Sequence, residues 1–378
     1  MKKPKIRFNG FNDDWEQRKL GKIVEVHNGK DYKHLEKGNI PVYGTGGYML
    51  SVSESLSDTQ DAIGIGRKGT IDKPYILRAP FWTVDTLFYC IPREENDLNF
   101  IFDIFQNINW RLMDESTGVP SLSKKSINNV KILVPNKKEQ KQIGLYFNQL
   151  DHLITLHQRK CDEIKKLKKY MLQNMFPQDE EKVPKIRFYG FTDDWEQCKF
   201  GELVDKYEDL VETPTDGYMR LGIRSHAKGT FYSYVEKGKE LETAKMFRVA
   251  ANNFIVNITF GWEHAVAITD ENDAGKLVSH RFPQYQFHKG MIPKFFKYLI
   301  LDESFKHHLE LSSPGGAGRN RVLKLNDMLN YQMRFPSEQE QKKVANYFDT
   351  LDTLITLHQR KCDELKNMKK FMLQNMFV

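Results

Sequence analysis

The sequence predicts an α+β protein: two β-rich globular domains separated by two long helices that form an antiparallel coiled coil, related by a pseudo-twofold internal repeat. Three observations predict this fold. The helical segment at 153–176 recurs at 354–377 with 20 of 24 positions identical. The segment at 4–17 recurs at 184–197 with 12 of 14 positions identical. Between these repeats lie two long stretches of β-branched and aromatic residues punctuated by glycine, a pattern typical of short strands and turns.

Composition and charge limit the class of protein. A chain of 378 residues suggests two or three domains, and its 40% hydrophobic residues suffice for sizeable cores. The net charge of +7 is concentrated in the repeated helix, which holds six Lys or Arg against two acids at 153–176 and five against two at 354–377. Such a charge run is compatible with a nucleic-acid partner and equally with a solvated helix face.

The sequence predicts an intracellular protein. No signal peptide is readable at the beginning of the sequence, and no run of about 18 apolar residues, the length of a membrane span, occurs. The four cysteines, Cys90, Cys161, Cys198 and Cys362, show neither C-x-x-C spacing nor a disulfide framework. We therefore expect a reducing, cytoplasmic environment.

The repeats divide the chain into alternating domains and helices. The first repeat recurs after 180 residues and the helix after 201, so the second intervening stretch is 21 residues longer. These stretches, 18–134 and 198–335, share little sequence. The predicted segments are a first domain at 1–138, a helix at 139–177, a second domain at 178–338 and a helix at 339–378. Constant repeats around unlike stretches indicate one shared assembly role and two different recognition tasks.

The long helices show a heptad pattern. A first row of residues falls seven apart: Ile143, Leu150, His157, Ile164 and Met171, repeated as Val344, Leu351, His358, Leu365 and Met372. The second row is predicted as Tyr146, Leu153, Lys160 and Leu167. Each long helix begins shortly after a proline that is followed by Glu and Gln at the same spacing. In the first helix these residues are Pro135, Glu139 and Gln140, and in the second they are Pro336, Glu340 and Gln341. Because a lone helix cannot bury such a stripe, the two helices are expected to pack antiparallel, each about 55 Å long.

Two apolar positions in each helix widen this stripe. They are Phe147 and Ile154 in the first copy and Phe348 and Ile355 in the second. One interpretation is that they pack on their own globular domains. The other is that they form a docking face for helices of a partner subunit.

Glycine-rich loops with basic residues stand out in both domains. They lie at 44–47 and 64–70 in the first domain and at 224–230 and 313–321 in the second. Glycine lets the backbone approach a partner closely, while Arg, Lys and Asn supply donors for phosphates and base edges. Ordinary hairpin turns share this composition, so these loops alone leave both interpretations open.

The motifs of common catalytic sites are absent from the sequence. It contains no G-x-x-x-x-G-K-[ST], no G-x-S-x-G, no H-E-x-x-H and no Asn- or Asp-Pro-Pro-aromatic tetrapeptide of amino-methylating enzymes. We therefore expect a non-catalytic chain without a metal site. His157 and Cys161, repeated as His358 and Cys362, would suit zinc. A duplicated polar seam with small buried cysteines is the favoured interpretation.

Taken together, these residues resemble the specificity subunits of type I restriction-modification systems. The resemblance covers nearly the whole chain. It rests on PKIRFNGFNDDWEQRKLG and its repeat, on the P-x-x-x-E-Q start of each long helix, and on LDHLITLHQRK. The stretches IGIGRKGTIDKPYILRAPFWTVDTLFY and SSPGGAGRNRVLKLNDML are similar to target recognition domains of that family.

The resemblance implies a DNA sequence-specificity subunit with no activity of its own. Two target recognition domains would each read one half of a bipartite sequence in double-stranded DNA. Two modification subunits would carry S-adenosylmethionine, and two restriction subunits would supply the ATP- and Mg-dependent motor and nuclease. The implied DNA contacts are Thr45, Gly46, Gly47, Arg67, Lys68 and Thr70 in the first domain, and Arg224, His226, Lys228, Gly316, Arg319, Asn320 and Arg321 in the second.

Two other functions are compatible with the sequence. One is a coiled-coil scaffold that binds partner helices without reading DNA. The other is a stand-alone adenine methyltransferase with a degenerate motif, which the missing tetrapeptide disfavours.

Overall fold

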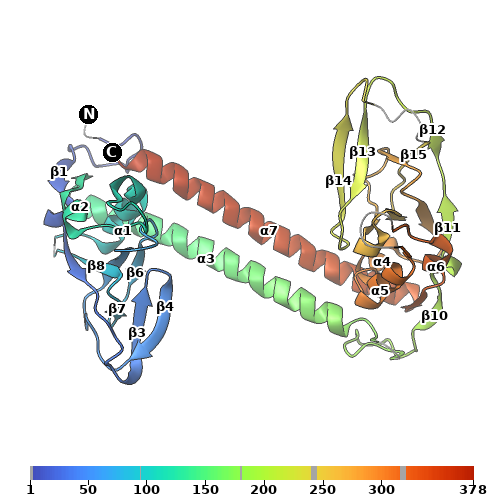
Figure 1. The fold of residues 1–378 in the computed structure, drawn as a ribbon, viewed down its shortest axis with the longest axis horizontal. Coiled ribbons are helices and arrows are strands. Elements are labelled where there is room, and N and C mark those ends of the chain that lie inside the picture. The colour runs from blue at the N-terminus through green and yellow to red at the C-terminus, as the bar shows by residue number, and fades with distance from the viewer. Residues whose placement is uncertain (1–2, 94, 179–180, 240–244, 316–320) are drawn as a thin grey trace. The chain divides into compact units, whose positions relative to one another are not determined.

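The chain folds into two compact units. The computed structural model describes residues 3–93, 95–178, 181–239, 245–315 and 321–378. Unit 1 comprises Met1–Lys160 and Leu357–Val378, and unit 2 comprises Cys161–Thr356. The long helices α3 (Lys137–Asn174) and α7 (Glu338–Met376) each contribute to both units (Figure 1). The predicted α+β class and both long helices are confirmed.

Unit 1 is built on short, mostly antiparallel strands. Its described strands form sheets in the orders β2-β8-β5-β6 and β4-β3-β7 and a ribbon of β1 and β9. The strands are β1 (Glu16–Lys19), β2 (Val24–Asn28), β3 (Lys37–Gly44), β4 (Gly47–Val52), β5 (Ala62–Gly66), β6 (Tyr75–Leu77), β7 (Trp82–Thr83), β8 (Leu87–Pro92) and β9 (Lys131–Val134). The helices are η1 (Leu20–Lys22), α1 (Leu98–Asn107), η2 (Trp110–Met113) and α2 (Lys124–Asn129), with η denoting 3₁₀ turns.

The core of unit 1 lies between α1, the sheet and the ends of the long helices. All five residues of β5 are buried, because this strand is central in its sheet and covered on both faces. The α1 helix begins where the Asp97 carboxylate accepts a hydrogen bond from the Phe100 amide at 3.0 Å. Phe100 packs edge-on against Trp15, a residue of the first repeat. The repeated segment therefore belongs to the domain core.

Unit 2 repeats this plan with longer insertions. Its described strands form sheets in the orders β11-β19-β16-β17 and β12-β15-β18-β13-β14 and a ribbon of β10 and β20. The strands are β10 (Glu196–Lys199), β11 (Val204–Tyr207), β12 (Leu210–Val211), β13 (Tyr218–Ile223), β14 (Thr230–Val235), β15 (Met246–Arg248), β16 (Asn253–Val256), β17 (Val266–Ile268), β18 (Leu277–Ser279), β19 (Gln284–Phe287) and β20 (Gln332–Phe335). The helices are η3 (Phe200–Glu202), η4 (Gly261–Glu263), α4 (Pro293–Leu299), α5 (Glu303–Leu311) and α6 (Leu325–Leu329).

The repeated residues make the same contacts in each unit. The Arg7 guanidinium binds the Glu139 carboxylate through two hydrogen bonds of 2.6 and 2.7 Å. Arg187 binds Glu340 in the same way, with both bonds at 2.8 Å. The backbone repeats as well, since Ile6 donates to the Asn375 carbonyl in unit 1 and Ile186 to the Asn174 carbonyl in unit 2. The sequence repeat is therefore a repeat of structure.

Within each unit, α3 and α7 lie side by side and run antiparallel. In unit 1, the Lys369 ammonium contacts Asp151 at 2.6 Å, and the Cys362 thiol faces the Ile154 carbonyl oxygen at 3.9 Å. In unit 2, Lys168 contacts Asp352 at 2.5 Å. Residue numbers rise along one helix as they fall along the other, which confirms the predicted antiparallel pairing.

The first heptad row is confirmed, whereas the predicted second row is wrong after Tyr146, which is partly buried against the core of unit 1. Leu153 and Leu167 of that row are 40% and 43% exposed. The inward row lies one residue later and consists of Phe147, Ile154, Cys161 and Lys168. Positions three and four residues after a first-row residue flank it on opposite sides of the helix. Both flanks are largely apolar here, and each contains one lysine, Lys160 or Lys168, so tertiary packing decides which flank is buried.

The structure contradicts a partner surface at Phe147 and Phe348. Both side chains are 0% exposed and belong to the cores of unit 1 and unit 2, respectively. The ring of Phe147 lies 5.8 Å from that of Phe377, and the ring of Phe348 lies 5.9 Å from that of Phe176. The first interpretation therefore applies to these two residues. Ile154 and Ile355 are partly buried, and their role in partner binding stays a prediction.

The histidines of the seam face each other. Nδ1 of His157 lies 2.9 Å from Nδ1 of His358. The Cys161 thiol faces the Ile355 carbonyl oxygen at 3.8 Å, as Cys362 faces Ile154. Among the residues described, no group of three or more His, Cys, Asp or Glu side chains is arranged to hold a metal ion. These contacts favour the duplicated polar seam.

A buried carboxyl in unit 1 predicts an unusual pH dependence of stability. Asp103 is 1% exposed, and its Oδ2 atom has no hydrogen-bond partner among the described residues. Burial raises the pKa of Asp103 well above its ordinary value, with Asp151 and Asp97 adding to the shift and Lys369 opposing it. Above about pH 4 the folded state then holds a proton that the unfolded state has released.

We expect Asp103→Asn to flatten this dependence. The unfolding free energy of the wild type should fall as pH rises above about 4, by up to about 1.4 kcal/mol per pH unit for one proton, until the folded-state pKa is passed. The variant should lack this contribution, while all other titrations are shared and cancel in the comparison. Urea unfolding of both proteins at several pH values measures the difference. Parallel pH curves would show that Asp103 ionises normally.

Candidate nucleic-acid interface

The two candidate loops of unit 1 form one surface. Thr45 and Gly46 connect β3 to β4, and Gly47 begins β4 with a φ of +105°. Lys68 and Thr70 belong to the loop that follows β5. A Cβ atom built on Gly69 would lie 4.0 Å from Oγ1 of Thr45. The structure thus places the two candidate loops next to each other at Thr45 and Gly69.

Backbone contacts hold the Arg67 loop while its basic side chains stay exposed. The amides of Arg67 and Lys68 donate to the Thr86 carbonyl at 2.8 and 3.3 Å. A Cβ atom on Gly66 would lie 2.0 Å from the Thr70 carbonyl oxygen, so the turn requires glycine. The side chains of Arg67 and Lys68 are exposed. A ligand would therefore meet a loop whose backbone is already ordered, which lowers the entropic cost of binding.

The Arg67 guanidinium is also positioned. It lies 5.9 Å from the centroid of the Phe88 ring, and its Nη1 atom donates to the Asp85 carbonyl at 3.4 Å. A guanidinium stacks well on an aromatic face and carries five N–H donors, so donors remain for an acceptor on a ligand. This arrangement suits recognition of a base edge or a phosphate.

The sequence did not predict two exposed residues that lie beside this surface. Tyr48 and Met49 are 63% and 49% exposed on β4, directly after the glycine turn. The alternating pattern of this segment predicted a strand but not its position. The structure shows that β4 is at the edge of its sheet, where outward side chains are uncovered. Large apolar residues directly after a glycine turn were the available signal.

In unit 2, Arg224, His226 and Lys228 lie in the loop between β13 and β14. All three side chains are exposed. His226 and the following Ala227 adopt left-handed backbone conformations, with φ of 60° and 48°. Such conformations are costly for residues other than glycine and concentrate at functional sites.

Hydrogen bonds to the short turn η4 hold this loop in place. The amides of His226 and Ala227 donate to the carbonyls of Glu263 and His264, both at 2.8 Å, and the Ser225 hydroxyl donates to the Glu263 carboxylate. Burial lowers the pKa of His264, which keeps the imidazole neutral near pH 7 while it contacts the Ile300 carbonyl at 2.8 Å. The strained loop therefore rests on a fixed support.

Arg321 contacts the same turn. Its guanidinium lies 5.5 Å from the Trp262 ring of η4, and Nη1 lies 3.9 Å from the Glu310 carboxylate. The side chain is 30% exposed. The structure thus places two separate candidate segments of unit 2 against η4. Gly316, Arg319 and Asn320 lie outside the described residues.

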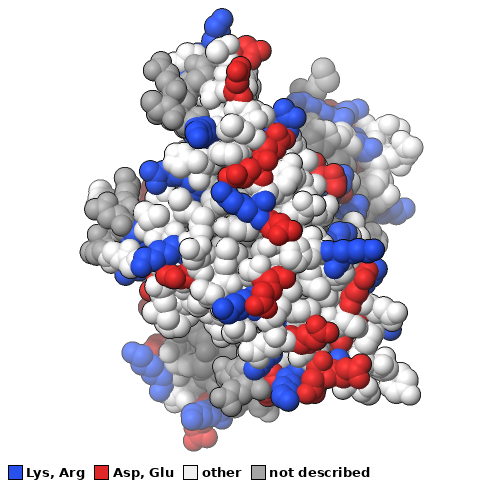
Figure 2. Space-filling view, turned by 90° about the vertical axis from the view of Figure 1, so that its right-hand side faces the viewer, with Lys and Arg blue, Asp and Glu red and all other residues white. Residues whose placement is uncertain are grey.

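Charge is mixed on one face of the molecule. On the face that Figure 2 presents, Lys and Arg side chains are interspersed with Asp and Glu side chains. Many neighbours pair, as Lys206 does with Glu208 at 2.6 Å. A surface of alternating sign exerts little long-range attraction on DNA. Recognition would then depend on the few basic groups that the loops position.

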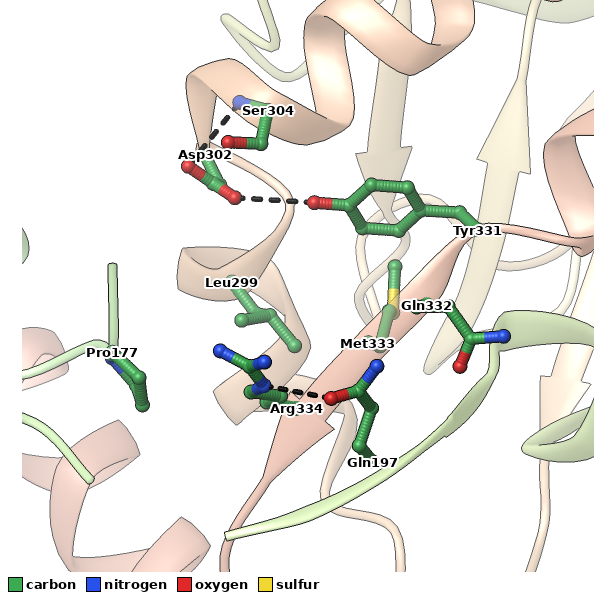
Figure 3. Close-up of a pocket in the computed structure, with 9 residues that line it drawn as sticks. All are labelled: Pro177, Gln197, Leu299, Asp302, Ser304, Tyr331, Gln332, Met333 and Arg334. Atoms are coloured by element: carbon green, nitrogen blue, oxygen red, sulfur yellow. Dashed lines mark hydrogen bonds between the residues drawn. The ribbon is translucent and has the colours of Figure 1, made fainter. Parts of the chain in front are cut away.

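A small pocket of unit 2 contains a carboxylate, a tyrosine and an arginine (Figure 3). It has a volume of about 170 Å³ and lies between the β10–β20 ribbon and the start of α5. Burial raises the pKa of Asp302, but this carboxylate caps α5 at the Ser304 amide (3.3 Å) and accepts the Tyr331 hydroxyl (3.2 Å). Across the pocket, Arg334 donates to Gln197 at 2.9 Å. These groups bond to one another, as in a structural cluster.

The family of the chain follows from comparison with known proteins. The family described as "Type I restriction modification DNA specificity domain" matches residues 12–166 and 192–367. The chain belongs to this family. The match falls once on each repeat, so this specificity chain carries the family domain twice, and the resemblance seen in its sequence is confirmed.

Individual relatives agree with this assignment. The specificity chain is 26% identical over 273 residues to the type I restriction enzyme MjaVIII specificity subunit of Methanocaldococcus jannaschii, covering 68% of the chain but 63% of that protein. It is 22% identical over 421 residues to the putative MjaX specificity subunit of the same organism, covering 97% and 93%. The S subunit structure from M. genitalium matches with a TM-score of 0.68 and 12% identity, covering 100% and 99%, which supports the fold.

Among the helices in the described parts of the specificity chain, none combines the length and the apolar character that crossing a bilayer requires.

Proposed function

We propose that this specificity chain is a non-catalytic DNA-reading subunit in which each unit recognises one half of a bipartite target. The observation that carries the proposal is that one shared framework supports two different loop clusters. The Arg7–Glu139 and Arg187–Glu340 pairs are equivalent, whereas unit 1 presents a glycine turn and Arg67 and unit 2 presents a strained loop beside η4. Equal frameworks suit a shared assembly role, and unlike loops suit two different sequences.

The chemistry of the complex is assigned to partner subunits. Two modification subunits would bind S-adenosylmethionine and methylate the DNA that this chain positions. Two restriction subunits would supply ATP- and Mg²⁺-dependent translocation and cleavage. The contribution of this chain is then to bind double-stranded DNA and to hold these subunits, and the phosphate and base contacts of its arginines and lysines supply the affinity.

The solvent-facing sides of the long helices supply a surface for the modification subunits. Exposed apolar residues recur at equivalent positions of the two repeats. They are Leu156, Leu167 and Tyr170 on α3 and Leu357, Met368 and Phe371 on α7, each between 43% and 58% exposed. In each helix these residues are eleven and three positions apart, which places them on one side of the helix, where an apolar helix of a partner would bury them together. Ile154 and Ile355, which are partly buried in the seam, would border this contact.

Methylation mapping tests the proposal. The chain is co-expressed with its modification subunit, and methylated adenines are located by single-molecule sequencing. We expect two short specified blocks around a fixed unspecified gap, and replacing residues 18–134 by those of another specificity chain should change one block only. A continuous motif from a soluble complex would contradict two separate readers. Absence of salt-sensitive DNA binding by that complex would favour the protein-interaction scaffold.

We expect Arg67→Ala to weaken recognition of one block. Loss of a bidentate contact with a base should reduce binding to the specific site by about 1–3 kcal/mol, with little change on random DNA. Arg78→Ala is the matched control, because Arg78 is 61% exposed in the same unit and pairs with Asp61 at 2.5 Å. Competition binding with specific and random duplexes measures both values. Equal losses on the two duplexes would identify Arg67 as a phosphate contact.

A further inference from the structure

The β13–β14 hairpin of unit 2 has one face in the core and one partly open face. The strands pair in register from Tyr218 opposite Val235 to Ile223 opposite Thr230. Leu221 and Ile223 point into the core, being 0% and 7% exposed. Residues alternate between the two faces of a strand. Arg220 and Gly222 of β13, with Phe231 and Ser233 of β14, therefore occupy the opposite face.

This hairpin is free of acidic residues. From Tyr218 to Val235 the sequence contains Arg220, Arg224 and Lys228 but no Asp or Glu. All three basic side chains are exposed. This local excess of positive charge contrasts with the mixed charges of the face in Figure 2. A hairpin with three cations and no carboxylate is suited to approach the phosphates of DNA.

The ring of Phe231 packs directly over a glycine of the neighbouring strand. Gly222 is its cross-strand partner, and a Cβ atom built on Gly222 would lie 2.4 Å from Cζ of the Phe231 ring. Any other residue at 222 would therefore displace the ring. Phe231 is nevertheless 41% exposed. The arrangement holds a large aromatic ring flat at the surface, where it is available to another group.

Arg224 uses this ring as a support. Its guanidinium lies 5.4 Å from the centroid of Phe231, and its Nη1 atom donates to the Thr230 carbonyl. The backbone of the loop is fixed as well, since the Arg224 amide donates to the Gly229 carbonyl at 2.9 Å and His226 is bound to η4. An arginine held in this way loses little conformational entropy when it binds a planar acceptor.

The hairpin is held against the domain from its other face. Oδ1 of Asp273 accepts hydrogen bonds from the Thr230 hydroxyl at 2.8 Å and the Tyr232 hydroxyl at 2.9 Å. Asp273 is 2% exposed, so this anchor is internal. The two strands, which carry Arg220 and Phe231, and the Arg224 loop that joins them therefore form a rigid element.

We propose that the β13–β14 hairpin is the element of unit 2 that enters the major groove of DNA, with Arg224 reading a base and Phe231 acting as the positioning residue that orients it. A two-stranded ribbon fits this groove, and arginine recognises guanine there through two hydrogen bonds. Arg220 and Ser233, which bond to each other at 3.3 Å, supply further polar contacts on the same face. Lys228 contacts a phosphate. The inference rests on the proposed function and assigns its reading element in unit 2.

The test uses the complex with the modification subunit and measures methylation rates on duplexes that carry the mapped target or single changes in either block. We expect Phe231→Leu and Gly222→Ala each to slow methylation of the intact target about tenfold and to reduce discrimination in one block only. Phe231→Tyr keeps the ring and should retain the wild-type rate. Arg224→Lys keeps the charge but loses the bidentate fork, and should relax the same position as Phe231→Leu.

Tyr234→Leu is the matched control, because Tyr234 is an aromatic residue on β14 that is 61% exposed and lies on the other face of the strand. Suppose that the wild-type complex shows a split motif and that the variants at 231 and 222 behave like this control. That result would overturn the inference and leave the proposed function intact. Equal loss of both blocks would also overturn it. If Phe231→Leu fails to assemble, Arg224→Lys decides: full discrimination by that variant excludes Arg224 as a reader. A wild-type complex without a split motif refutes the proposed function itself.

Discussion

Glu139→Ala is expected to lower the unfolding free energy of unit 1 by about 3–5 kcal/mol, the typical cost of removing one partner of a buried ion pair. The Glu139 side chain is 0% exposed and that of Arg7 is 12% exposed. Their two hydrogen bonds of 2.6 and 2.7 Å are charge-assisted and join the first repeat to the start of α3. Without the carboxylate, the largely buried guanidinium loses both hydrogen bonds and keeps only the weaker attraction of Asp13 and Asp14.

The chain supplies its own control. In unit 2, Arg187 and Glu340 form the equivalent pair, with side chains 14% and 1% exposed. Hydrogen exchange of the full chain resolves the two units, so Glu139→Ala should increase exchange in unit 1 and Glu340→Ala in unit 2. Glu338→Ala is the matched surface control, since Glu338 pairs with Lys342 at 2.5 Å but is 49% exposed. Its replacement should change the stability little, because an ion pair in solvent is screened by water.

Two results would contradict this account. If Glu139→Ala cost no more than Glu338→Ala, the pair would not contribute to the stability of unit 1. If it increased exchange equally in both units, the pair would act on the whole chain. A double replacement of Arg7 and Glu139 by apolar residues should recover much of the loss, because no buried charge is then left without its partner.

The neighbouring glutamine explains why the helix start is repeated so closely. The Gln140 side chain accepts from the Asp97 amide at 3.1 Å and donates to the Pro135 carbonyl at 3.0 Å. Gln341 repeats both contacts, with the Ile292 amide and the Pro336 carbonyl, each at 2.9 Å. Glutamate thus binds the repeated segment, while glutamine binds the domain helix and the preceding turn. The P-x-x-x-E-Q motif therefore connects the start of each long helix to the repeated segment and to the domain helix.

The framework was predictable because identical residues make identical contacts. A duplicated segment such as PKIRF implied a duplicated environment, and the heptad spacing of Ile143, Leu150 and His157 implied a partner helix. These features depend on local periodicity or on internal comparison, both of which are present in one sequence.

The loops were predictable only as candidates. Their composition indicated that Arg67 and Arg224 were available for contact, but not that each lies over an aromatic ring. Phe88 and Phe231 come from strands whose pairing depends on tertiary structure. The role of η4 was equally hidden, because no periodicity links Glu263 to the loop at His226. Contacts between distant segments, and the backbone strain they maintain, are set by the folded domain.

Phe147→Ala is the second substitution with a large expected effect, and it tests the correction made by the structure. Phe147 is 0% exposed and contacts the rings of Tyr146 and Phe377 at centroid distances of 5.3 and 5.8 Å. Truncating a buried phenylalanine typically costs about 3–5 kcal/mol through lost burial and the cavity that remains. We expect this loss in the unfolding free energy of unit 1, measured by hydrogen exchange or urea unfolding of the full chain.

Leu156→Ala separates stability from assembly. Leu156 lies on the same helix but is 43% exposed, so its truncation should change the unfolding free energy by about 0.5 kcal/mol or less. If the exposed stripe binds the modification subunit, this variant should lower the affinity of that subunit while the chain remains stable. The opposite pattern, a stable Phe147→Ala variant that no longer binds its partner, would mean that the partner reaches a side chain that the folded unit encloses. A helix with apolar residues around much of its circumference can use one side for its own core and another for a partner, and these two variants distinguish the sides.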